Sequence, residues 1–505
     1  MHTTRLTKVI EPKEREKPFW LEAGSRLRIM LIQPPVSGGV LTILPHFQSG
    51  EGIGHKPPLG LLSIATYLKQ HSDHDIRILD CLPRNLSIAE TVALVSEFSP
   101  HLVGLSAWTE LWHPAFLLGR TIKYKFPEIH LTYGGPHISI FPRETLDLSF
   151  VDSVIVGDGE VPFFYLANML ANKQKDNSCP GLHFKEYGVK AYPETFHIQQ
   201  NLDELPAVDR TLLPLNDYNS VLGRENISTT MVTSRGCPNA CVFCKLNFQK
   251  TICRSARSII DEFVAIRDLG YREVEIYDDT FTWSRQRVRD ICEGLIQLDL
   301  GVKWAIRDRV SNASEELLQL MRRAGCIRIN YGVESGSDRI LNVVKKKITT
   351  SQARNAVAMA KQLGYEVLCF FMFGNPTETK EEMRQTIAFA LELDPDYCEF
   401  SVAIPYPGTQ MYEDALTEGI ISYDYWTEFA KNPPSNFTIP QLIETHASRG
   451  ELIALHDEAY RLFYFRPKYM LRQALHVRNI GELKRKAQMA FRLFRSVFRW
   501  QCKRQ

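Results

Sequence analysis

T-S-R-G-C-P-N-A-C-V-F-C-K, residues 233–245, places Cys237, Cys241 and Cys244 in C-x3-C-x2-C spacing. Cysteine thiolates are the usual protein ligands of iron–sulfur clusters, so three of them can hold three irons of a 4Fe–4S cubane. The fourth iron would then lack a protein ligand and could bind a small molecule. This stretch is therefore a candidate reaction centre.

The spacing alone leaves two other interpretations open. Zinc sites usually combine two C-x2-C pairs, or a cysteine pair with a histidine pair. Here no Cys or His follows Cys244 within eight residues, and Cys253 is the nearest spare thiol. A disulfide framework is not expected, because eleven cysteines are spread over 505 residues and no secretory signal precedes them. The motif predicts a cluster, with zinc or incidental thiols as the alternatives.

Composition places the chain among ordinary globular proteins. It is 44% hydrophobic and 23% charged, and its length predicts about two to four domains. A formal net charge of +2 gives no global electrostatic reason to bind nucleic acid. The polar N-terminus does not resemble a signal peptide, and no uncharged run is long enough to span a bilayer. We expect a cytoplasmic protein, in a reducing compartment that suits an oxygen-labile cluster.

Strand and helix patterns alternate in the first third of the chain. After an irregular arm at residues 1–25, apolar runs recur between helix-like segments, which predicts a doubly wound parallel sheet over residues 26–175. Ligands of such sheets bind beyond the carboxyl ends of the strands. No G-x-G-x-x-G follows the first strand, so a dinucleotide is not favoured. The residues expected at these strand ends are Gln33, Ser106, Gly134, Gly135, Gly157, Gly159 and Glu160.

A second alternating region begins after a proline-containing linker predicted at residues 176–225. Six strand–helix units follow, which predicts a partial (β/α)6 TIM-like barrel at residues 226–430 with its catalytic groups at the carboxyl ends of the strands. The cysteine stretch follows the first of these strands. The other ends carry Asp278, Asp279, Arg307, Glu334 and Ser335. We expect these side chains to meet a polar ligand with an amine, a carboxylate and a ribose.

Residues 431–505 depart from the barrel pattern and are predicted to be helical. From Arg466 onward there are twelve Lys or Arg and one acidic residue, Glu482. This predicts a basic amphipathic tail helix that packs its aromatic face on the barrel, with contact to a membrane surface or an acidic partner as alternatives. The pattern consists of Phe491, Phe494 and Phe498 at helical spacing, with Arg492, Arg495 and Arg499 one position over.

These motifs resemble a known family. C-P-N-A-C-V-F-C is similar to the cysteine loop of the radical S-adenosylmethionine enzymes. D-D-T-F-T, G-V-E-S-G-S, F-G-N-P-T-E-T and P-Y-P-G-T resemble the subgroup with an N-terminal cobalamin-binding domain, which includes the anaerobic porphyrin ring cyclase and the hopanoid methylases. P-P-L-G-L-L-S-I-A-T-Y-L, Y-G-G-P-H and I-V-G-D-G-E match that domain. The resemblance covers roughly residues 26–430.

The resemblance implies a role for each matching position. The three motif cysteines would ligate three irons, and Phe243 would border the adenine of S-adenosylmethionine. Asp278 or Asp279 would hold the methionyl amine, while Arg307, Glu334 and Ser335 would hold the carboxylate or the ribose. The strand-end residues of the first domain would contact cobalamin. Its lower axial ligand does not follow, because Q-P-P-V-S-G-G stands where histidine-ligating domains have D-x-H-x-x-G.

The resemblance implies that one electron, from a donor such as flavodoxin or ferredoxin, yields a 5′-deoxyadenosyl radical that abstracts hydrogen from a small-molecule or lipid-like substrate. Methylation of an unactivated carbon by way of cobalamin is the first hypothesis. Radical cyclisation, rearrangement or oxidation of a lipid or tetrapyrrole is the second, and a non-enzymatic metal-binding protein is the third. A methylthiotransferase is disfavoured, because the first domain contains only Cys81 and Cys179 in or near it.

Overall fold

The computed structural model describes residues 24–36, 54–173, 178–185, 196–220, 222–225, 227–245, 250–435 and 437–475, with residues 483, 486–488, 490, 491 and 494. The chain divides into two compact units. The first unit contains Gly60–Gln199 together with the described residues before 37. The second contains Gln200–Trp426 together with the described residues from Thr438 onward. Each unit also takes in a short segment from elsewhere in the chain: Thr427–Phe437 belongs to the first unit, and residues 54–59 belong to the second.

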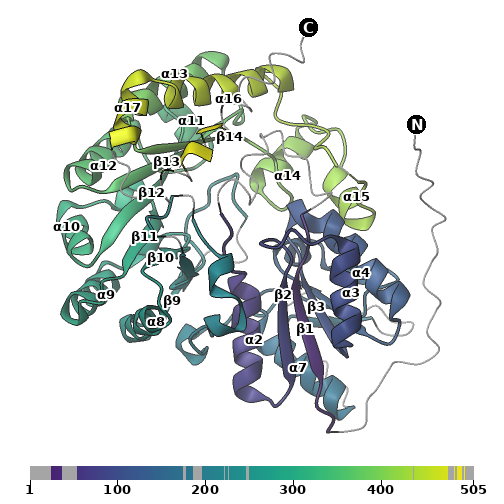
Figure 1. The fold of residues 1–505 in the computed structure, drawn as a ribbon. Helices are drawn as coiled ribbons and strands as arrows, with labels where there is room; N and C mark the ends of the chain where they lie inside the picture. Colours follow the sequence, from purple (N-terminus) through teal and green to yellow (C-terminus); the bar gives the residue numbers. More distant parts are fainter. Residues whose placement is uncertain are drawn as a thin grey trace. The chain divides into compact units, whose positions relative to one another are not determined.

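The first unit contains a six-stranded sheet in the order β2-β1-β3-β4-β5-β6, of which Figure 1 labels β1, β2 and β3. The first five strands are parallel, and β6 is antiparallel to β5. The apolar runs of the sequence become strands that are largely buried in the middle of the sheet, whereas the edge strands β2 and β6 are mostly half-buried. The order reverses direction at β1, as in doubly wound folds. The strands are β1 (Arg28–Gln33), β2 (Asp75–Asp80), β3 (Leu102–Ser106), β4 (His130–Gly134), β5 (Ser153–Ile155) and β6 (Leu182–Phe184).

Helices cover both faces of this sheet, which confirms the predicted doubly wound domain. On one face α2 (Leu59–His71) meets α7 (Glu160–Asn172) through the rings of Tyr67 and Phe164, whose centroids are 5.8 Å apart. On the other face α3 (Ile88–Phe98) packs beside α4 (Trp112–Lys125). Ser87 and Glu90 form a capping box that starts α3. Two short helices, α5 (Pro136–Ile140) and α6 (Pro142–Leu146), follow β4.

The segment predicted as a linker, residues 176–225, is divided between the two units. Its first half extends the first sheet, because β6 pairs with β5 and His197 bridges to Gly157. Its second half joins the second unit, where Arg210 contacts Glu262. The strand β6 comes from this segment, and residues 186–195, which follow it, lie outside the described residues. Polar composition marked the segment, but the edge strand that it supplies depends on pairing with a distant partner.

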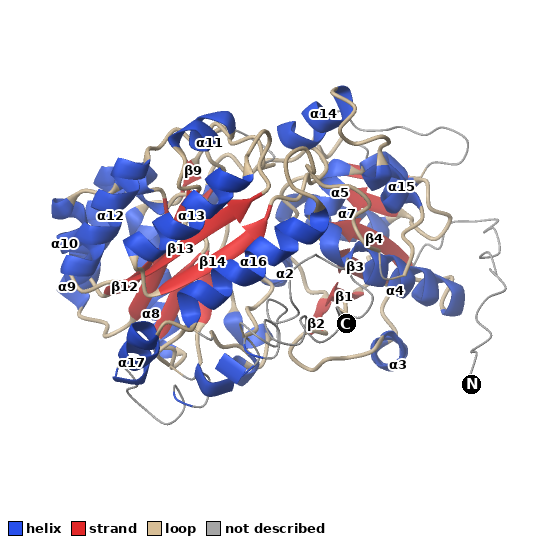
Figure 2. Ribbon diagram, turned by 90° about the horizontal axis from the view of Figure 1, so that it is seen from above, coloured by secondary structure: helices blue, strands red, loops and turns tan. Residues whose placement is uncertain are grey.

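The second unit contains six parallel strands in the order β14-β13-β12-β11-β10-β7, which confirms the partial barrel. Helices lie on the outside of these strands, as Figure 2 shows for α10, α12 and α13. The strands are β7 (Thr229–Met231), β10 (Glu273–Ile276), β11 (Lys303–Asp308), β12 (Cys326–Glu334), β13 (Glu366–Phe373) and β14 (Tyr397–Val402). The helices between them are α8 (Ala256–Asp268), α9 (Arg285–Leu298), α10 (Glu315–Arg323), α11 (Asp338–Val343), α12 (Thr350–Gln362) and α13 (Lys380–Leu393).

The C-terminal region is helical, as predicted. It follows α14 (Gln410–Thr417) and α15 (Tyr425–Lys431) and consists of α16 (Arg449–Tyr464) and α17 (Pro467–Leu475). The helix α16 packs on β14, where the ring of Tyr460 meets Phe400 edge-on. Asp394 accepts hydrogen bonds from Arg466 and Arg472 and so ties α17 to the start of β14.

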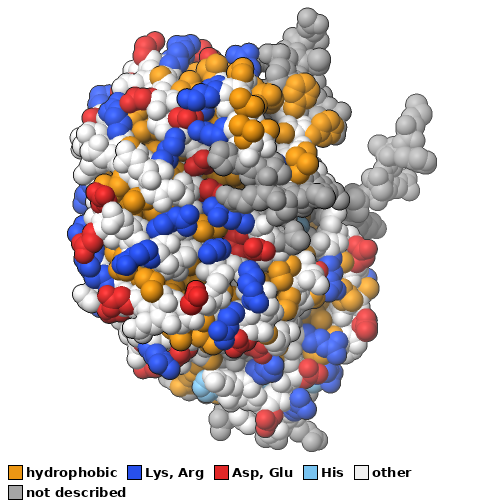
Figure 3. Space-filling view, turned by 60° about the vertical axis from the view of Figure 1, so that its left-hand side comes forward, with side chains coloured by type: hydrophobic (Ala, Val, Ile, Leu, Met, Phe, Trp, Pro, Cys, Tyr) orange, Lys and Arg blue, Asp and Glu red, His pale blue; other side chains and the backbone are white. Residues whose placement is uncertain are grey.

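Only part of the predicted tail helix can be compared with the structure. Phe491 and Phe494 are 61% and 51% exposed, whereas Phe498 and the three arginines lie outside the described residues. These two rings are thus mostly exposed, although the ring of Phe494 lies 6.2 Å from that of Phe465 at the end of α16. Within the described part of the chain, no helix is both long and apolar enough to span a bilayer. Acidic and basic side chains are interspersed on the face drawn in Figure 3.

Candidate functional site

The cysteine stretch forms a loop at the carboxyl end of the first barrel strand. It leaves β7, forms the short strand β8 (Ser234–Arg235) and turns at Gly236, whose φ of +86° is accessible to glycine at little cost. The strand β8 pairs antiparallel with β9 (Ile252–Cys253). The loop carries the motif cysteines at its tip: Cys237 and Cys241 are buried, and Cys244 is exposed.

Asp278 supports the root of this loop. Its carboxylate accepts hydrogen bonds from the backbone nitrogens of Thr233, at 2.6 Å, and Ser234, at 3.0 Å. It also accepts hydrogen bonds from both hydroxyl groups, that of Ser234 at 2.7 Å. The side chain is fully buried. These four bonds occupy the carboxylate, so of the two aspartates that the resemblance offered for the methionyl amine, Asp278 is a structural residue.

Arg287 of α9 completes this support. Its Nη1 donates to the carbonyl oxygen of Thr233 at 3.1 Å and to the hydroxyl of Thr233 at 2.9 Å, and its Nη2 donates to the carbonyl oxygen of Phe281 at 3.0 Å. The guanidinium also lies 3.6 Å from Asp278. One buried ion pair thus joins the cysteine loop to the next strand end.

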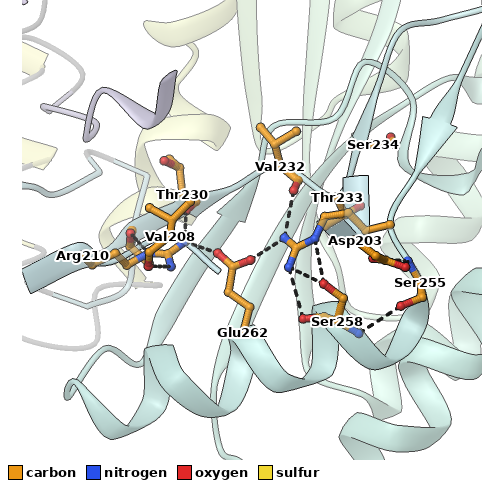
Figure 4. A network of polar contacts seen from close by, with 12 residues as sticks. Asp203, Val208, Arg210, Thr230, Val232, Thr233, Ser234, Ser255, Ser258 and Glu262 are labelled. Atoms are coloured by element: carbon orange, nitrogen blue, oxygen red, sulfur yellow. Dashed lines mark hydrogen bonds and ion pairs between the residues drawn. The ribbon is translucent and has the colours of Figure 1, made fainter. Parts of the chain in front are cut away.

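A second buried network holds β7 from below (Figure 4). Glu262 of α8 lies between Arg210, at 2.7 Å, and Arg254. Burial opposes the charge on Glu262, but the two guanidinium groups hold its pKa below the ordinary value. Arg210 also donates to the carbonyl oxygen of Thr230 at 2.7 Å, and Arg254 donates to that of Val232 at 3.2 Å. The strand that leads into the loop is therefore fixed by charge as well as by the sheet.

The three motif cysteines lie at the tip of one loop and supply the thiolates that iron–sulfur clusters use. Within the described residues, no three His, Cys, Asp or Glu side chains converge closely enough to hold one ion. The ligands of a cubane bind separate irons, so their sulfur atoms need not converge on one point. Donors also approach the sulfurs, since Asn239 Nδ2 lies 3.1 Å from Cys237 Sγ and Arg309 Nη1 lies 3.8 Å from Cys241 Sγ. The donor set thus fits a 4Fe–4S cluster.

Polar side chains at the other strand ends surround the loop. Asp279 lies at the surface, where desolvation by the surrounding protein atoms and the charge of Asp278 raise the pKa of its carboxyl group. Arg307 stacks on the ring of Tyr277 at 3.9 Å, and its Nε has no hydrogen-bond partner within the described part of the chain. Glu334 accepts a hydrogen bond from Lys346 Nζ at 2.6 Å. These strand ends therefore offer both carboxylates and cations to a ligand with an amine, a carboxylate and a ribose.

The resemblance predicts that Glu334, Phe243 and Ser335 contact S-adenosylmethionine, and the structure places them in three different surroundings. Glu334 has a φ of +69°, a conformation that side-chain-bearing residues seldom adopt, at the point where the register of β12 shifts. The ring of Phe243 is half-buried, with Lys346 Nζ 5.8 Å from its centroid. Ser335 is fully buried and hydrogen-bonds to Thr386 of α13 at 3.2 Å. Ser335 thus faces the surrounding helix and supports the turn rather than the mouth.

The barrel interior holds a charge network that sequence reasoning missed. Arg328 is 1% exposed and lies 3.8 to 4.0 Å from three carboxylates, those of Glu273, Glu275 and Glu366. Lys56 reaches Glu275 at 2.9 Å. Burial opposes ionisation of Glu275, but Lys56 and Arg328 lower its pKa to about 2. The alternation of side chains along β10 signals this network, because the charged residues Glu273 and Glu275 are two positions apart and so point to the same side of the strand as each other. Arg328 is the charged residue that meets them from β12.

The first unit places its predicted residues at the carboxyl ends of its strands. Gln33 ends β1 and Ser106 ends β3, and these neighbouring strands flank the point where the order of the sheet reverses. Ligands of doubly wound sheets bind at this switch point. Gly134 ends β4, where a Cβ would find only ordinary contacts at 3.7 Å or more. The position of these residues fits a ligand that lies over the carboxyl ends of the strands.

The other predicted residues of this unit have structural roles. A Cβ at Gly135 would lie 2.8 Å from the carbonyl oxygen of Ala107, and a Cβ at Gly157 would lie 2.1 Å from that of His197. These glycines are required by the unit's own backbone, with φ of +104° and +92°. Gly159 precedes α7 against Ile64. Glu160 is buried and accepts a hydrogen bond from Ser63 at 2.6 Å.

His137 lies in an aromatic cluster of the first unit. It is fully buried and stacks on Trp112 at 4.5 Å, and burial lowers its pKa to about 3. Trp112 in turn donates its indole N–H to the carbonyl oxygen of Ala430 at 3.0 Å. His113 lies 2.9 Å from the carbonyl oxygen of Pro433. These contacts explain why Thr427–Phe437 belongs to the first unit.

Comparisons with known proteins agree with both halves of the structure. Residues 231–390 match the model of the radical SAM superfamily, where SAM is S-adenosylmethionine, and residues 53–167 match that of the B12 binding domain. An uncharacterised methyltransferase of Pyrococcus horikoshii is 31% identical over 453 residues, which cover 88% of this chain and 94% of the relative. An anaerobic magnesium-protoporphyrin IX monomethyl ester cyclase of Rubrivivax gelatinosus is 26% identical, covering 85% and 78%.

A solved structure shares the fold. The radical S-adenosylmethionine methyltransferase TsrM from Kitasatospora setae, with cobalamin and a 4Fe–4S cluster bound, superposes with a TM-score of 0.63. The identity is 18%, and the match covers 79% of each chain. At this identity the likeness concerns the fold, which combines the two kinds of unit described above.

Proposed function

Because the chain belongs to the cobalamin-dependent radical S-adenosylmethionine enzymes, we propose that it methylates an unactivated carbon of a biosynthetic intermediate. Its cofactors are a 4Fe–4S cluster, S-adenosylmethionine and cobalamin. The observation that carries the proposal is the loop with Cys237, Cys241 and Cys244 at the end of the first barrel strand, in a chain that also contains a B12-type sheet.

When bound, these cofactors supply a 5′-deoxyadenosyl radical and a methyl group, and the protein supplies positioning and exclusion of water. The motif cysteines would ligate three irons. Asp279 would accept the methionyl amine, since Asp278 is already occupied by the loop. Arg307 is the cation available for the carboxylate, and Glu334, which already pairs with Lys346, is the acceptor for the ribose hydroxyls. Gln33, Ser106 and Gly134 would contact cobalamin at the switch point.

The test needs no knowledge of the substrate. Protein reconstituted anaerobically with iron, sulfide and cobalamin is reduced and given S-adenosylmethionine labelled in its methyl group. The proposal predicts both 5′-deoxyadenosine and S-adenosylhomocysteine, with label recovered on cobalamin. Reductive cleavage without any S-adenosylhomocysteine contradicts methylation and favours radical cyclisation, rearrangement or oxidation. Binding of zinc, or of iron without cleavage, supports the metal-binding protein instead.

We propose that the electron donor is a small acidic protein such as flavodoxin or ferredoxin. Lys245 of the cysteine loop is exposed, as are Lys345 and Lys347 in the turn after α11. The backbone nitrogen of Val242 donates to the carbonyl oxygen of Val344 at 3.2 Å, so this turn adjoins the loop. Cations around a redox centre steer an anionic donor toward it.

Charge reversal at Lys345 and Lys347 tests the donor. The change should slow reduction of the cluster by flavodoxin, and added salt should weaken the effect. Reduction by dithionite, a small inorganic reductant, serves as the control and should stay within twofold of wild type. An equal rate with flavodoxin in both proteins would argue against this surface.

We further propose that the C-terminal region contacts an anionic membrane surface, which would suit a lipid-like substrate. Three neighbouring side chains of α17 are 54%, 63% and 75% exposed, those of Met470, Leu471 and Leu475. They lie in the region with twelve basic residues and one acidic residue. Apolar side chains beside cations suit an interface with anionic lipid.

Vesicle sedimentation tests this contact. The protein should bind phosphatidylglycerol vesicles more than phosphatidylcholine vesicles, and Leu471→Ser with Leu475→Ser should weaken the binding. Failure of the wild-type protein to bind anionic vesicles would contradict the proposal.

A further inference from the structure

Two nitrogen-bearing side chains donate hydrogen bonds to sulfur atoms of the cysteine loop, and the hydroxyl of Thr280 also lies 3.7 Å from Cys237 Sγ. Asn239 Nδ2 lies 3.1 Å from Cys237 Sγ, and Arg309 Nη1 lies 3.8 Å from Cys241 Sγ. We propose that Arg309, assisted by Asn239, sets the reduction potential of the cluster through these N–H···S contacts. The inference rests on the proposed role of the motif cysteines as cluster ligands. In it Arg309 is a positioning and tuning residue, since it acts through a ligand rather than on the substrate.

Arg309 is held in place both at its backbone and at its guanidinium. Its backbone nitrogen donates to Asp308 Oδ1 at 2.8 Å, and Asp308 is fixed in turn by the hydroxyl of Thr282 at 2.5 Å. Its Nη2 donates to the carbonyl oxygen of Lys346. Arg309 is only 8% exposed. The side chain therefore cannot swing into solvent without breaking buried hydrogen bonds, and its contact with the cysteine is built into the fold.

The charge of Arg309 is directed at the sulfur. In the described part of the chain, its guanidinium contacts a backbone carbonyl and a thiol group but no carboxylate. Lys346 differs, because Glu334 lies 2.6 Å from its Nζ and balances its charge. Arg287, the buried arginine at the root of the loop, is likewise balanced, because Asp278 lies 3.6 Å from its guanidinium. Of these three buried cations in the described part of the chain, Arg309 is thus the one without a carboxylate partner.

The sign of the effect follows from electrostatics. Reduction adds one negative charge, which spreads over the cluster and its sulfur ligands. Hydrogen bonds to these sulfurs, and a buried positive charge beside them, stabilise the reduced form more than the oxidised form. Both contacts therefore raise the potential and make it easier for a donor to reduce the cluster. Arg309 should contribute more than Asn239, because it carries a full charge and Asn239 does not.

Redox titration followed by electron paramagnetic resonance tests the inference, on full-length protein reconstituted anaerobically without S-adenosylmethionine. At one applied potential, Arg309→Met should lower the ratio of reduced to oxidised cluster at least tenfold, which is 59 mV for a one-electron couple. Arg309→Lys should recover part of this loss by restoring the charge. Asn239→Ala should shift the ratio in the same direction by less. The control is Arg339→Gln, an exposed arginine paired with Glu382, which should leave the ratio unchanged.

The outcomes separate this inference from the proposed function. If wild-type protein forms no reducible cluster, the proposed function fails. If wild-type protein forms one and the ratio in Arg309→Met and Asn239→Ala equals that of wild type, the inference fails. If Arg309→Met binds too little iron to titrate, Arg309→Lys and Asn239→Ala decide: a lowered ratio supports the inference, and an unchanged ratio overturns it.

Discussion

Replacing Asp278 with alanine should destabilise the barrel unit and prevent stable cluster loading. The change leaves the backbone nitrogens of Thr233 and Ser234 without their acceptor inside the protein. Each buried unsatisfied donor costs about 1–3 kcal/mol. The buried guanidinium of Arg287, 3.6 Å away, also loses its carboxylate, and breaking a buried ion pair costs about 3–5 kcal/mol. Because these contributions overlap, we expect a loss of about 4 kcal/mol.

The matched control is Asp279→Ala, one residue along the chain. Asp279 is exposed, and its carboxylate accepts a hydrogen bond from the backbone nitrogen of Gly236, so its removal should lower the free energy of unfolding by only about 1 kcal/mol. Urea unfolding of the iron-free proteins measures both changes. Trp304 is a buried reporter, since its ring lies 5.6 Å from that of Phe281 beside this strand end.

Iron content and ligand binding separate the two aspartates further. Asp278→Ala should retain less iron than wild type after anaerobic reconstitution. Asp279→Ala should retain the cluster and weaken S-adenosylmethionine binding, because its carboxylate is the one available for the amine. Equal unfolding free energies for the two variants, or a larger loss in Asp279→Ala, would refute the assignment of Asp278 as the support of the loop.

Further predictions concern pH, cluster ligands and the first unit. Burial raises the pKa of Glu378 to about 7, so the free energy of unfolding should fall as pH rises from about 4.5 to 7. Urea titrations at several pH values should show that Glu378→Gln flattens this slope. A slope equal to that of wild type would contradict the prediction. Serine at any motif cysteine should abolish the 4Fe–4S absorbance, whereas Cys253→Ser should retain it, and loss in Cys253→Ser would make that thiol a ligand. Trp112→Phe removes the hydrogen bond to Ala430 and should cost about 1 kcal/mol, with faster hydrogen exchange confined to residues around 427–437; unchanged exchange there would argue against this anchor.

Much of the fold follows from the sequence because parallel strands buried on both faces are apolar runs bounded by turn residues. The same pattern placed the cysteine loop at a strand end. Alternation along strands also holds information that the prediction did not use. Glu275 of β10 and Tyr277, directly after β10, both lie near Arg307 and Arg328. Continuing this alternation assigns Asp279 to the same side and Asp278 to the opposite side. The same alternation assigns the neighbouring residues Glu334 and Ser335 to opposite sides of β12.

Other features depend on distant partners and have no local signal. Arg309 has the same parity as Arg307, so its inward direction could be inferred, but its contact with Cys241 depends on how the loop folds back. Arg287 lies on a helix whose sequence gives no sign that it reaches the strand before it. The antiparallel strand β6 and the packing of Thr427–Phe437 on the first unit arise from pairings across the chain. Local patterns do not determine such pairings.

The central claim is that Cys237, Cys241 and Cys244 hold a 4Fe–4S cluster with one iron open to S-adenosylmethionine. Electron paramagnetic resonance of the reduced, anaerobically prepared protein, recorded before and after adding S-adenosylmethionine, tests it most directly. The account predicts about four irons per chain and a cubane signal whose g-values change when S-adenosylmethionine binds the open iron. A protein that contains zinc, or a cluster whose spectrum S-adenosylmethionine leaves unchanged at saturating concentration, would contradict it.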